Sequence, residues 1–194
     1  MIITEKDCIN KNDEQLVSLT LNEQEYYLCL IKRYENKLRN YIMKISSANL
    51  QDAEDILQEV FIKAYQNLND FDFNYKFSNW IFRITHNVTI SNYRKKNISS
   101  LAISWEENDM DNILQATLNI EQKNIQNLSY ENILKIIERL PLKYKEVLIL
   151  KFIEDKDYKA ISDILHKPTG TIATLLNRAK KMLTRELIKE GIEL

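Results

Sequence analysis

The sequence predicts an all-α fold: two small helical domains joined by an acidic linker, with a helix-turn-helix in the second domain. Three observations favour this fold. The 194 residues include only two glycines and two prolines, whereas a sheet-rich fold needs many tight turns. Hydrophobic residues make up 44% of the chain, which is ample for globular cores. Apolar residues recur mostly three and four positions apart, the spacing of amphipathic helices.

Helical patterns divide the chain into two domains. Residues 12–97 carry a series of strong helical patterns and are expected to form the first domain. Residues 98–128 hold five acids against one base, with weak periodicity, and are expected to be a linker with room for one short helix. Periodic helix returns over residues 129–190, the expected second domain.

Charge is sorted along the chain, although its net value is only −1. Residues 52–59 hold four acids and no base, and residues 80–97 hold four bases and no acid. Residues 167–189 hold six bases against the single acid Glu186. This distribution suits contact with DNA at two places and with a protein partner at a third.

The two cysteines, Cys8 and Cys29, lie in different segments. No Cys/His cluster has the spacing of a zinc site, so neither a metal nor a cofactor is expected. Two thiols in a chain of this length suit a reducing cytoplasm. The N-terminus lacks the regions of a signal peptide, and no apolar run approaches the roughly 20 residues that span a bilayer. The expected location is the cytoplasm.

Residues 52–65 (DAEDILQEVFIKAY) predict a helix that begins with a favourable negative charge. One face is apolar and belongs to the core: Ala53, Ile56, Leu57, Val60 and Ala64. The other face gathers Glu54, Asp55, Gln58 and Glu59, together with Ile62 and Tyr65. Apolar residues within an acidic face indicate a partner surface, while an ordinary solvated face is the alternative.

Residues 71–77 (FDFNYKF) predict an aromatic loop, and Ser78 or a neighbour is expected to cap the helix that follows. The apolar face of that helix carries Phe77, Trp80, Ile81, Ile84 and Val88. Its other face carries Asn79, Phe82, Arg83, His86, Thr89 and Tyr93, and the helix ends in three bases. Exposed rings stack on unpaired bases and cations neutralise phosphates, so single-stranded DNA binding fits this mixture. Packing of Phe82 or Tyr93 under a neighbouring helix is the alternative, and His86 is expected to be a surface polar residue.

Residues 158–183 predict a helix-turn-helix. A short helix over residues 158–165 turns Ile161, Ile164 and Leu165 inward, and Pro168 suits the start of the next helix. The second helix has a buried stripe of Ile172, Leu176, Ala179 and Leu183. Its outer face carries Thr171, Thr174, Asn177, Arg178 and Lys181, which suit the major groove. A plain helical hairpin is the alternative.

Taken together, these segments resemble the extracytoplasmic-function (ECF) group of the sigma-70 family. Residues 52–65 resemble its polymerase-binding helix. Residues 77–87 (FSNWIFRITHN) and 93–96 (YRKK) resemble its promoter-melting and −10-recognition segment. Residues 140–150 (LPLKYKEVLIL), 168–172 (PTGTI) and 178–179 resemble its −35-binding domain. The order and spacing of the three segments match those of the family.

The resemblance implies a non-enzymatic initiation factor that binds core RNA polymerase, directs it to promoters and aids strand opening. Its implied partners are core polymerase, promoter DNA and an anti-sigma factor, with no small-molecule substrate. The implied polymerase contacts are Asp52, Glu54, Asp55, Gln58, Glu59 and Ile62. The implied −10 contacts are Asn74, Tyr75, Lys76, Asn79, Arg83, Asn87, Lys95 and Lys96. The implied −35 contacts are Thr169, Thr171, Thr174, Asn177, Arg178 and Lys181.

Some positions depart from the family pattern. The first helix of the helix-turn-helix has Ala160-Ile161-Ser162 where Glu-Ile-Ala is common, and His166 replaces the usual turn glycine. Ala173 and Leu175 replace bases that are common early in the recognition helix. These changes leave fewer phosphate contacts and predict weak −35 binding by the isolated domain.

Two other functions are compatible with parts of the sequence. A dimeric helix-turn-helix regulator explains the second domain but leaves the acidic helix and the aromatic loop without a role. A metal-dependent nuclease using Asp52, Glu54 and Asp55 would need further ligands, and none accompanies these acids.

Overall fold

A computed structural model describes residues 8–97 and 130–191. The described residues form helices and no strands, which confirms the all-α prediction. The expected linker, residues 98–128, and the first residue of the expected second domain lie outside the described residues. The helices of the first domain are α2 (Asp13–Asn22), α3 (Tyr27–Ser46), α4 (Leu50–Gln66) and α5 (Phe77–Asn97), with 3₁₀ turns η1 (Gln24–Tyr26) and η2 (Leu68–Asp70). The helices of the second domain are α6 (Tyr130–Arg139), α7 (Leu142–Leu148), α8 (Tyr158–Leu165) and α9 (Thr169–Lys189), with a π-helical turn η4 (Ile149–Ile153).

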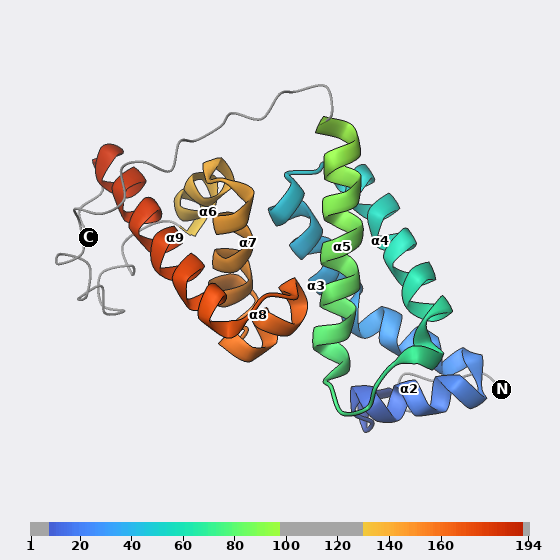
Figure 1. The fold of residues 1–194 in the computed structure, drawn as a ribbon. Helices are drawn as coiled ribbons and strands as arrows, with labels where there is room; N and C mark the ends of the chain where they lie inside the picture. Colours follow the sequence, from blue (N-terminus) through green and yellow to red (C-terminus); the bar gives the residue numbers. More distant parts are fainter. Residues whose placement is uncertain (1–7, 98–129, 192–194) are drawn as a thin grey trace.

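The first domain packs α3, α4 and α5 around one core, with α2 across one end (Figure 1). Each helix contributes a buried apolar face, as their amphipathic patterns predict. Tyr41 and Phe82 are fully enclosed and meet edge to face, with ring centroids 5.2 Å apart. A second group of rings, Phe71, Phe77 and Trp80, packs where the aromatic loop enters α5.

The first turn of α5 is capped by a residue that is distant in sequence. The backbone N–H of Phe77 donates to Glu14 Oε1 of α2 over 3.0 Å. The expectation that Ser78 or a neighbour caps this helix is wrong, because the carboxylate of another helix accepts the free N–H instead. By contrast, α4 is capped locally, since Asn49 accepts from the backbone N–H of Asp52 over 2.8 Å.

The helix-turn-helix of the second domain has the predicted boundaries. Helix α8 begins after Asp157, whose side chain accepts from the Ala160 N–H over 2.7 Å, and α9 begins after Pro168. His166 has a φ of 53°, which places it in the left-handed region. The family's glycine at this turn is therefore replaced by a residue that adopts the glycine-like conformation at some conformational cost.

The two domains are in contact. Helix α8 (orange) lies against α5 (green), and α7 and η4 contact α3 (Figure 1). Helix α4 lies on the far side of α5 from the second domain (Figure 1). This placement covers one long face of α5 and leaves the outer face of α4 open.

The cysteines differ from the expectation of two thiols. Cys8 and Cys29 form a disulfide with Cα atoms 5.4 Å apart, and it ties the start of the described chain to α3. Proximity in the fold, which segment spacing does not reveal, brings them together. Within residues 8–97 and 130–191, no helix combines the length and apolarity needed to cross a membrane.

Candidate nucleic-acid and protein interfaces

The outer face of α4 is an exposed surface of mixed character. Glu54, Asp55 and Gln58 are exposed, and Ile62 lies beside them with 58% of its surface accessible. The five apolar residues predicted for the inner face are all buried. A large aliphatic side chain that is exposed among acids is typical of a surface that a partner protein covers in a complex.

Glu59 differs from the other acids of α4 because it is held by neighbours. It accepts from Lys63 Nζ at 2.7 Å and from Asn92 Nδ2 of α5 at 3.0 Å. These hydrogen bonds, the one from Lys63 first, lower the pKa of the Glu59 carboxyl. Glu59 therefore also joins α4 to α5, whereas Asp55 makes no ion pair or side-chain hydrogen bond among the described residues.

The aromatic loop between η2 and α5 presents rings to solvent on a fixed backbone. Phe71 is buried and anchors the loop, while Phe73 and Tyr75 are 52% and 54% exposed. Asp72 Oδ1 accepts from both the backbone N–H and the side-chain amide of Asn74, at 2.9 and 2.8 Å. This local turn is typical of Asp and fixes the tip of the loop. The loop therefore offers exposed rings without a large ordering cost.

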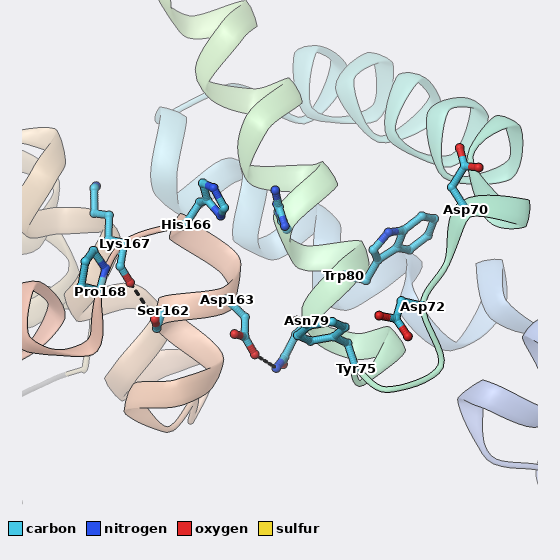
Figure 2. A pocket seen from close by; sticks show the side chains of 11 residues that line it. Asp70, Asp72, Tyr75, Asn79, Trp80, Ser162, Asp163, His166, Lys167 and Pro168 are labelled. Carbon is cyan, nitrogen blue, oxygen red and sulfur yellow. Dashed lines mark hydrogen bonds between the residues drawn. The ribbon is translucent and has the colours of Figure 1, made fainter.

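The loop forms one wall of a cleft of about 610 Å³ (Figure 2). Tyr75 and Trp80 supply aromatic surface, and Asp70, Asp72, Asn79 and Arg83 supply polar groups. The opposite wall belongs to the second domain and consists of Ser162, Asp163, His166, Lys167 and Pro168. Aromatic faces with hydrogen-bonding groups around them are what an unstacked base requires.

The polar face of α5 is only partly exposed. Arg83, Asn87 and Lys95 are exposed as expected for DNA contacts, and Tyr93 is 38% exposed. Asn79 is 9% exposed, and its amide donates to Asp163 Oδ2 of α8 over 3.3 Å. Among the other predicted −10 contacts, Asn74, Tyr75 and Lys76 are exposed, whereas the side chain of Lys96 lies outside the described residues.

Besides Asn79, three residues assigned to this polar face are buried. Phe82 is 2% exposed, Thr89 is fully buried and His86 is 9% exposed. The prediction that His86 is a surface residue is wrong. The alternative reading of Phe82, in which it packs under a neighbour, is the correct one. Phe82 and His86 meet α3 and the second domain, which the pattern of one helix cannot reveal.

His86 lies in a buried polar cluster between the domains. Its Nδ1 is 3.1 Å from the Tyr41 hydroxyl and its Nε2 is 3.6 Å from Glu146 Oε2. Glu146 in turn accepts from Lys167 Nζ at 2.5 Å. Burial, followed by the charges of Lys167 and Arg94, lowers the pKa of His86 to about 4. The imidazole is therefore neutral at pH 7. When Nδ1 accepts from the Tyr41 hydroxyl, the ring proton is on Nε2, which faces Glu146.

The outer face of α9 is open. Thr169, Thr171, Thr174, Asn177 and Arg178 are exposed and Lys181 is half-buried. Ile172, Leu176 and Ala179 are buried as predicted, and Leu183 and Leu175 are half-buried against the same core. Leu175 therefore widens the apolar stripe of α9.

Several residues of these surfaces were not identified from the sequence. Asp163 and Glu146 contact the polar face of α5 through Asn79 and His86. Lys145 is 5% exposed, with its Nζ 3.1 Å from Ser47 Oγ. Burial lowers the pKa of Lys145. The only local signal was a set of charged residues within otherwise apolar helices, and such residues are equally common on solvated faces.

Comparison with known proteins supports the resemblance. Residues 30–98 match the family model for Sigma-70 region 2, and residues 130–183 match the model for Sigma-70, region 4. The ECF RNA polymerase sigma factor SigW of Bacillus subtilis is 32% identical over 170 residues, which cover 85% of this chain and 90% of SigW. The ECF RNA polymerase sigma-E factor of Haemophilus influenzae is 28% identical, covering 90% of this chain and 95% of that protein.

Solved structures share the fold. CnrH, in complex with the cytosolic domain of CnrY, matches 91% of this chain and 97% of its own with a TM-score of 0.66 at 18% identity. The sigma factor RpoE of Bartonella quintana, in complex with the anti-sigma factor NepR, matches 88% of this chain and 98% of its own with a TM-score of 0.61 at 22% identity. With both sigma regions present in order, the chain belongs to the ECF group of the sigma-70 family, transcription initiation factors that direct RNA polymerase to promoters.

Proposed function

We propose that this factor uses three separate surfaces for initiation. The outer face of α4 binds the coiled coil of the largest polymerase subunit. The aromatic loop and α5 hold the −10 strand and help to open it, and the first half of α9 enters the −35 major groove. The exposed rings of Phe73 and Tyr75, held on a fixed loop beside a basic helix, carry the proposal.

The proposed contacts are distributed over the proposed domains. Residues 12–97 form region 2, residues 98–128 link the domains and residues 129–190 form region 4. The polymerase contacts are Asp52, Glu54, Asp55, Gln58, Glu59 and Ile62. The −10 contacts are Asn74, Tyr75, Lys76, Asn79, Arg83, Asn87, Lys95 and Lys96. The −35 contacts are Thr169, Thr171, Thr174, Asn177, Arg178 and Lys181.

The physical basis differs between the DNA surfaces. At −10, stacking on Tyr75 and Trp80 would replace the stacking that a base loses when the duplex opens. At −35, short polar side chains and Arg178 suit base edges and phosphates. Tethering of both domains to polymerase would compensate for the few cations of α9, because linked sites raise each other's effective concentration.

We also propose that the factor acts in the cytoplasm, has no catalytic activity of its own and is held inactive by an anti-sigma protein. The complex of the Bartonella quintana factor with NepR supports this kind of partner. Polymerase would perform the nucleotidyl transfer. An anti-sigma partner would compete with core polymerase for this chain, which a three-component pull-down measures.

Opening of a promoter tests the base-capture surface directly. Holoenzyme carrying Tyr75→Ala should open a promoter less well than wild type, measured by permanganate reactivity of unpaired thymines. Phe152→Ala is a matched control, because Phe152 is 53% exposed but lies in the second domain, outside the proposed contacts. Equal promoter opening by wild type and Tyr75→Ala would contradict the assignment.

A further inference from the structure

The Cys8–Cys29 disulfide lies outside the surfaces proposed for polymerase and DNA. It joins the segment before α2 to the first turn of α3, with Cα atoms 5.4 Å apart, a separation that is ordinary for such bonds. Both cysteines precede residue 30, where the match to Sigma-70 region 2 begins. Thiol reductants keep most cytoplasmic cysteines reduced, and the disulfides that do form there are usually transient or redox-sensing. In the cytoplasm proposed for this factor, the pair therefore indicates a reversible site.

The two cysteines differ in their access to solvent. Cys29 is 2% exposed and belongs to the core, whereas Cys8 is half-buried at its edge. Thiol–disulfide exchange requires a thiolate to reach one sulfur of the bond, and the other sulfur then leaves. An external thiolate therefore attacks the sulfur of Cys8 and displaces that of Cys29.

The reaction balances with a small thiol and its disulfide. The first small thiolate bonds to the sulfur of Cys8, the Cys8–Cys29 bond breaks, and Cys29 leaves as a thiolate that takes up a proton. A second small thiolate attacks the mixed disulfide, forms the small disulfide and releases Cys8, which also takes up a proton. Two small thiols are thereby oxidised to one disulfide, and both cysteines are reduced. Oxidation of the chain is the reverse reaction, with the small disulfide as the oxidant.

The disulfide holds residues 8–12, which lead directly into the first turn of α2. Arg33 of α3 donates to the backbone carbonyls of Cys8 and Lys11 at 2.8 and 2.9 Å. It also donates to Asp13 Oδ1, in the first turn of α2, at 2.6 Å. Hydrogen bonds from a half-buried side chain compete with water, so each contributes modestly. The disulfide adds a covalent tie to this group, and its loss leaves the first turn of α2 less firmly placed.

The first turn of α2 also contacts the proposed −10 surface. Glu14 Oε1 accepts from the backbone N–H of Phe77 over 3.0 Å, where the aromatic loop enters α5. Helix α2 lies beside η2 and the start of α5, which flank the loop (Figure 1). Leu16 and Val17, in the next part of α2, are fully buried. Reduction therefore leaves α2 in the core and acts on its first turn, which weakens the cap and loosens the loop around Tyr75.

We propose that Cys8 and Cys29 form a redox site through which a small thiol couple tunes promoter opening. The oxidised chain holds Glu14 in its capping position and keeps the aromatic loop fixed, whereas the reduced chain holds both less firmly. The inference rests on the role proposed for the loop at −10 and on the proposed cytoplasmic location. Glu14 is a positioning residue, because it acts on the loop through the Phe77 N–H. More oxidising conditions therefore favour promoter opening.

Equilibration of the full chain with mixtures of reduced and oxidised glutathione tests the chemistry. Maleimide-linked polyethylene glycol, added in denaturant, then counts the free thiols of the chain's two cysteines on a gel. The chain should gain both thiols as the mixture becomes reducing and lose both when the mixture becomes oxidising again. A chain that stays oxidised in reduced glutathione, or reduced in oxidised glutathione, would overturn the redox site.

Promoter opening tests the coupling to the loop. The free chain is oxidised or reduced, the glutathione is removed, and untreated core polymerase is added without air. On a promoter selected from a random library by wild-type holoenzyme, oxidised chain should give more permanganate-reactive thymines than reduced chain. The difference should be up to about fivefold, the factor that one lost helix cap represents in an equilibrium. Affinity for core polymerase should be the same for both forms, because the proposed polymerase contacts are on α4.

Variants of the cysteines remove the redox site itself. Cys8→Ser should open the promoter as the reduced wild type does, whichever treatment the chain receives. Cys29→Ala should behave in the same way, and it keeps the buried position apolar. It therefore serves as the second variant if Cys8→Ser does not fold.

Variants of Glu14 locate the coupling. Glu14→Ala should open the promoter as poorly as the reduced wild type and should show no redox dependence. Glu14→Gln keeps an oxygen that accepts from the Phe77 N–H, so it should restore the redox dependence. Glu23→Ala is the matched control, because Glu23 makes no cap hydrogen bond through its side chain. It should respond to oxidation as the wild type does.

Equal promoter opening by oxidised and reduced wild type would overturn the tuning role, as would a redox dependence that persists in Glu14→Ala. A parallel loss of core binding would overturn it too, because that result indicates general destabilisation. Tyr75→Ala provides the separate check of the proposed function. If Tyr75→Ala opens the promoter as well as wild type, the −10 role of the loop fails and the tuning role falls with it. The glutathione titration still decides whether the cysteines form a redox site.

Discussion

Helices α4 and α5 belong to the same domain and have the same kind of sequence pattern, yet their polar faces are exposed to different extents. Each sequence predicts one apolar face and one recognition face with an apolar residue in it. On α4 that residue, Ile62, is 58% exposed, whereas on α5 the corresponding Phe82 is 2% exposed. The second domain packs against α5 and does not cover the outer face of α4 (Figure 1).

The difference shows that amphipathic patterning identifies a face but not what covers it. A partner surface and an interface between domains both require apolar residues among polar ones. On α4 the proposed partner is another protein, and the surface is open in the structure. On α5 the neighbour is part of the same chain, so part of the polar face is already covered, while Arg83, Asn87 and Lys95 stay exposed.

Truncation of the two apolar residues should give the largest contrast. Phe82→Ala should lower the free energy of unfolding by about 3–5 kcal/mol, because it empties a buried site beside Tyr41. Ile62→Ala should change it by less than about 0.5 kcal/mol, because the side chain is exposed. Urea unfolding of the full chain measures both. Equal losses would show that the two faces are covered alike.

Because His86 is buried on α5, its titration should make the free energy of unfolding depend on pH. Burial holds the pKa of this imidazole at about 4 against an ordinary value of 6.5. The unfolded chain therefore binds more protons between these values, and stability should fall as the pH falls from 6.5 toward 4. The loss should be up to about 3 kcal/mol, since one pKa unit is about 1.4 kcal/mol.

Nuclear magnetic resonance can follow His86 directly. The chain has two histidines, so His166→Asn leaves one imidazole, and Asn tolerates the left-handed backbone at that position. The His86 resonances should titrate near pH 4. A transition near 6.5 would show that the domains are open in solution, and His86→Gln should remove its part of the pH dependence of stability.

Charge reversal on the open face should affect binding and leave the fold intact. Asp55→Lys should weaken the affinity for core polymerase at least tenfold, which corresponds to about 1.4 kcal/mol, without a change in unfolding. Asp55 is a better test than Glu59, because Glu59 also holds Asn92 of α5. Glu186→Lys, on the second domain, is the control in the same titration. Unchanged affinity of Asp55→Lys would remove α4 from the polymerase interface.

Removing the capping residues of α4 and α5 should lower the free energy of unfolding, but by less than Phe82→Ala does. Asn49→Ala and Glu14→Ala each remove a group that accepts from the first turn of a helix, α4 and α5 respectively. Each should cost about 1 kcal/mol. Glu23→Ala is the control for Glu14→Ala, because Glu23 makes no cap hydrogen bond through its side chain. A loss from Glu23→Ala equal to that from Glu14→Ala would contradict the long-range cap.

Local patterns predicted most of the helices of this protein. The apolar stripe of α4, the limits of α8 and the exposed threonines of α9 follow from spacing, caps and turn residues within a few positions of each other. Such features are predictable because the i to i+4 geometry of a helix fixes which neighbours share a face. The family models confirm the family resemblance. The roles that it implies for individual residues stay predictions.

The features missed from the sequence all depend on contacts between distant segments. The cap on Phe77 comes from a residue 63 positions away, the His86 cluster joins α3, α5 and α7, and the Cys8–Cys29 pair joins two segments. The sequence does not show whether water or a buried partner makes the hydrogen bonds of a polar residue. The sequence by itself determined the helices, their apolar faces and the family. Only the tertiary structure decided which polar face is open and which is covered, because coverage depends on what packs across from a helix.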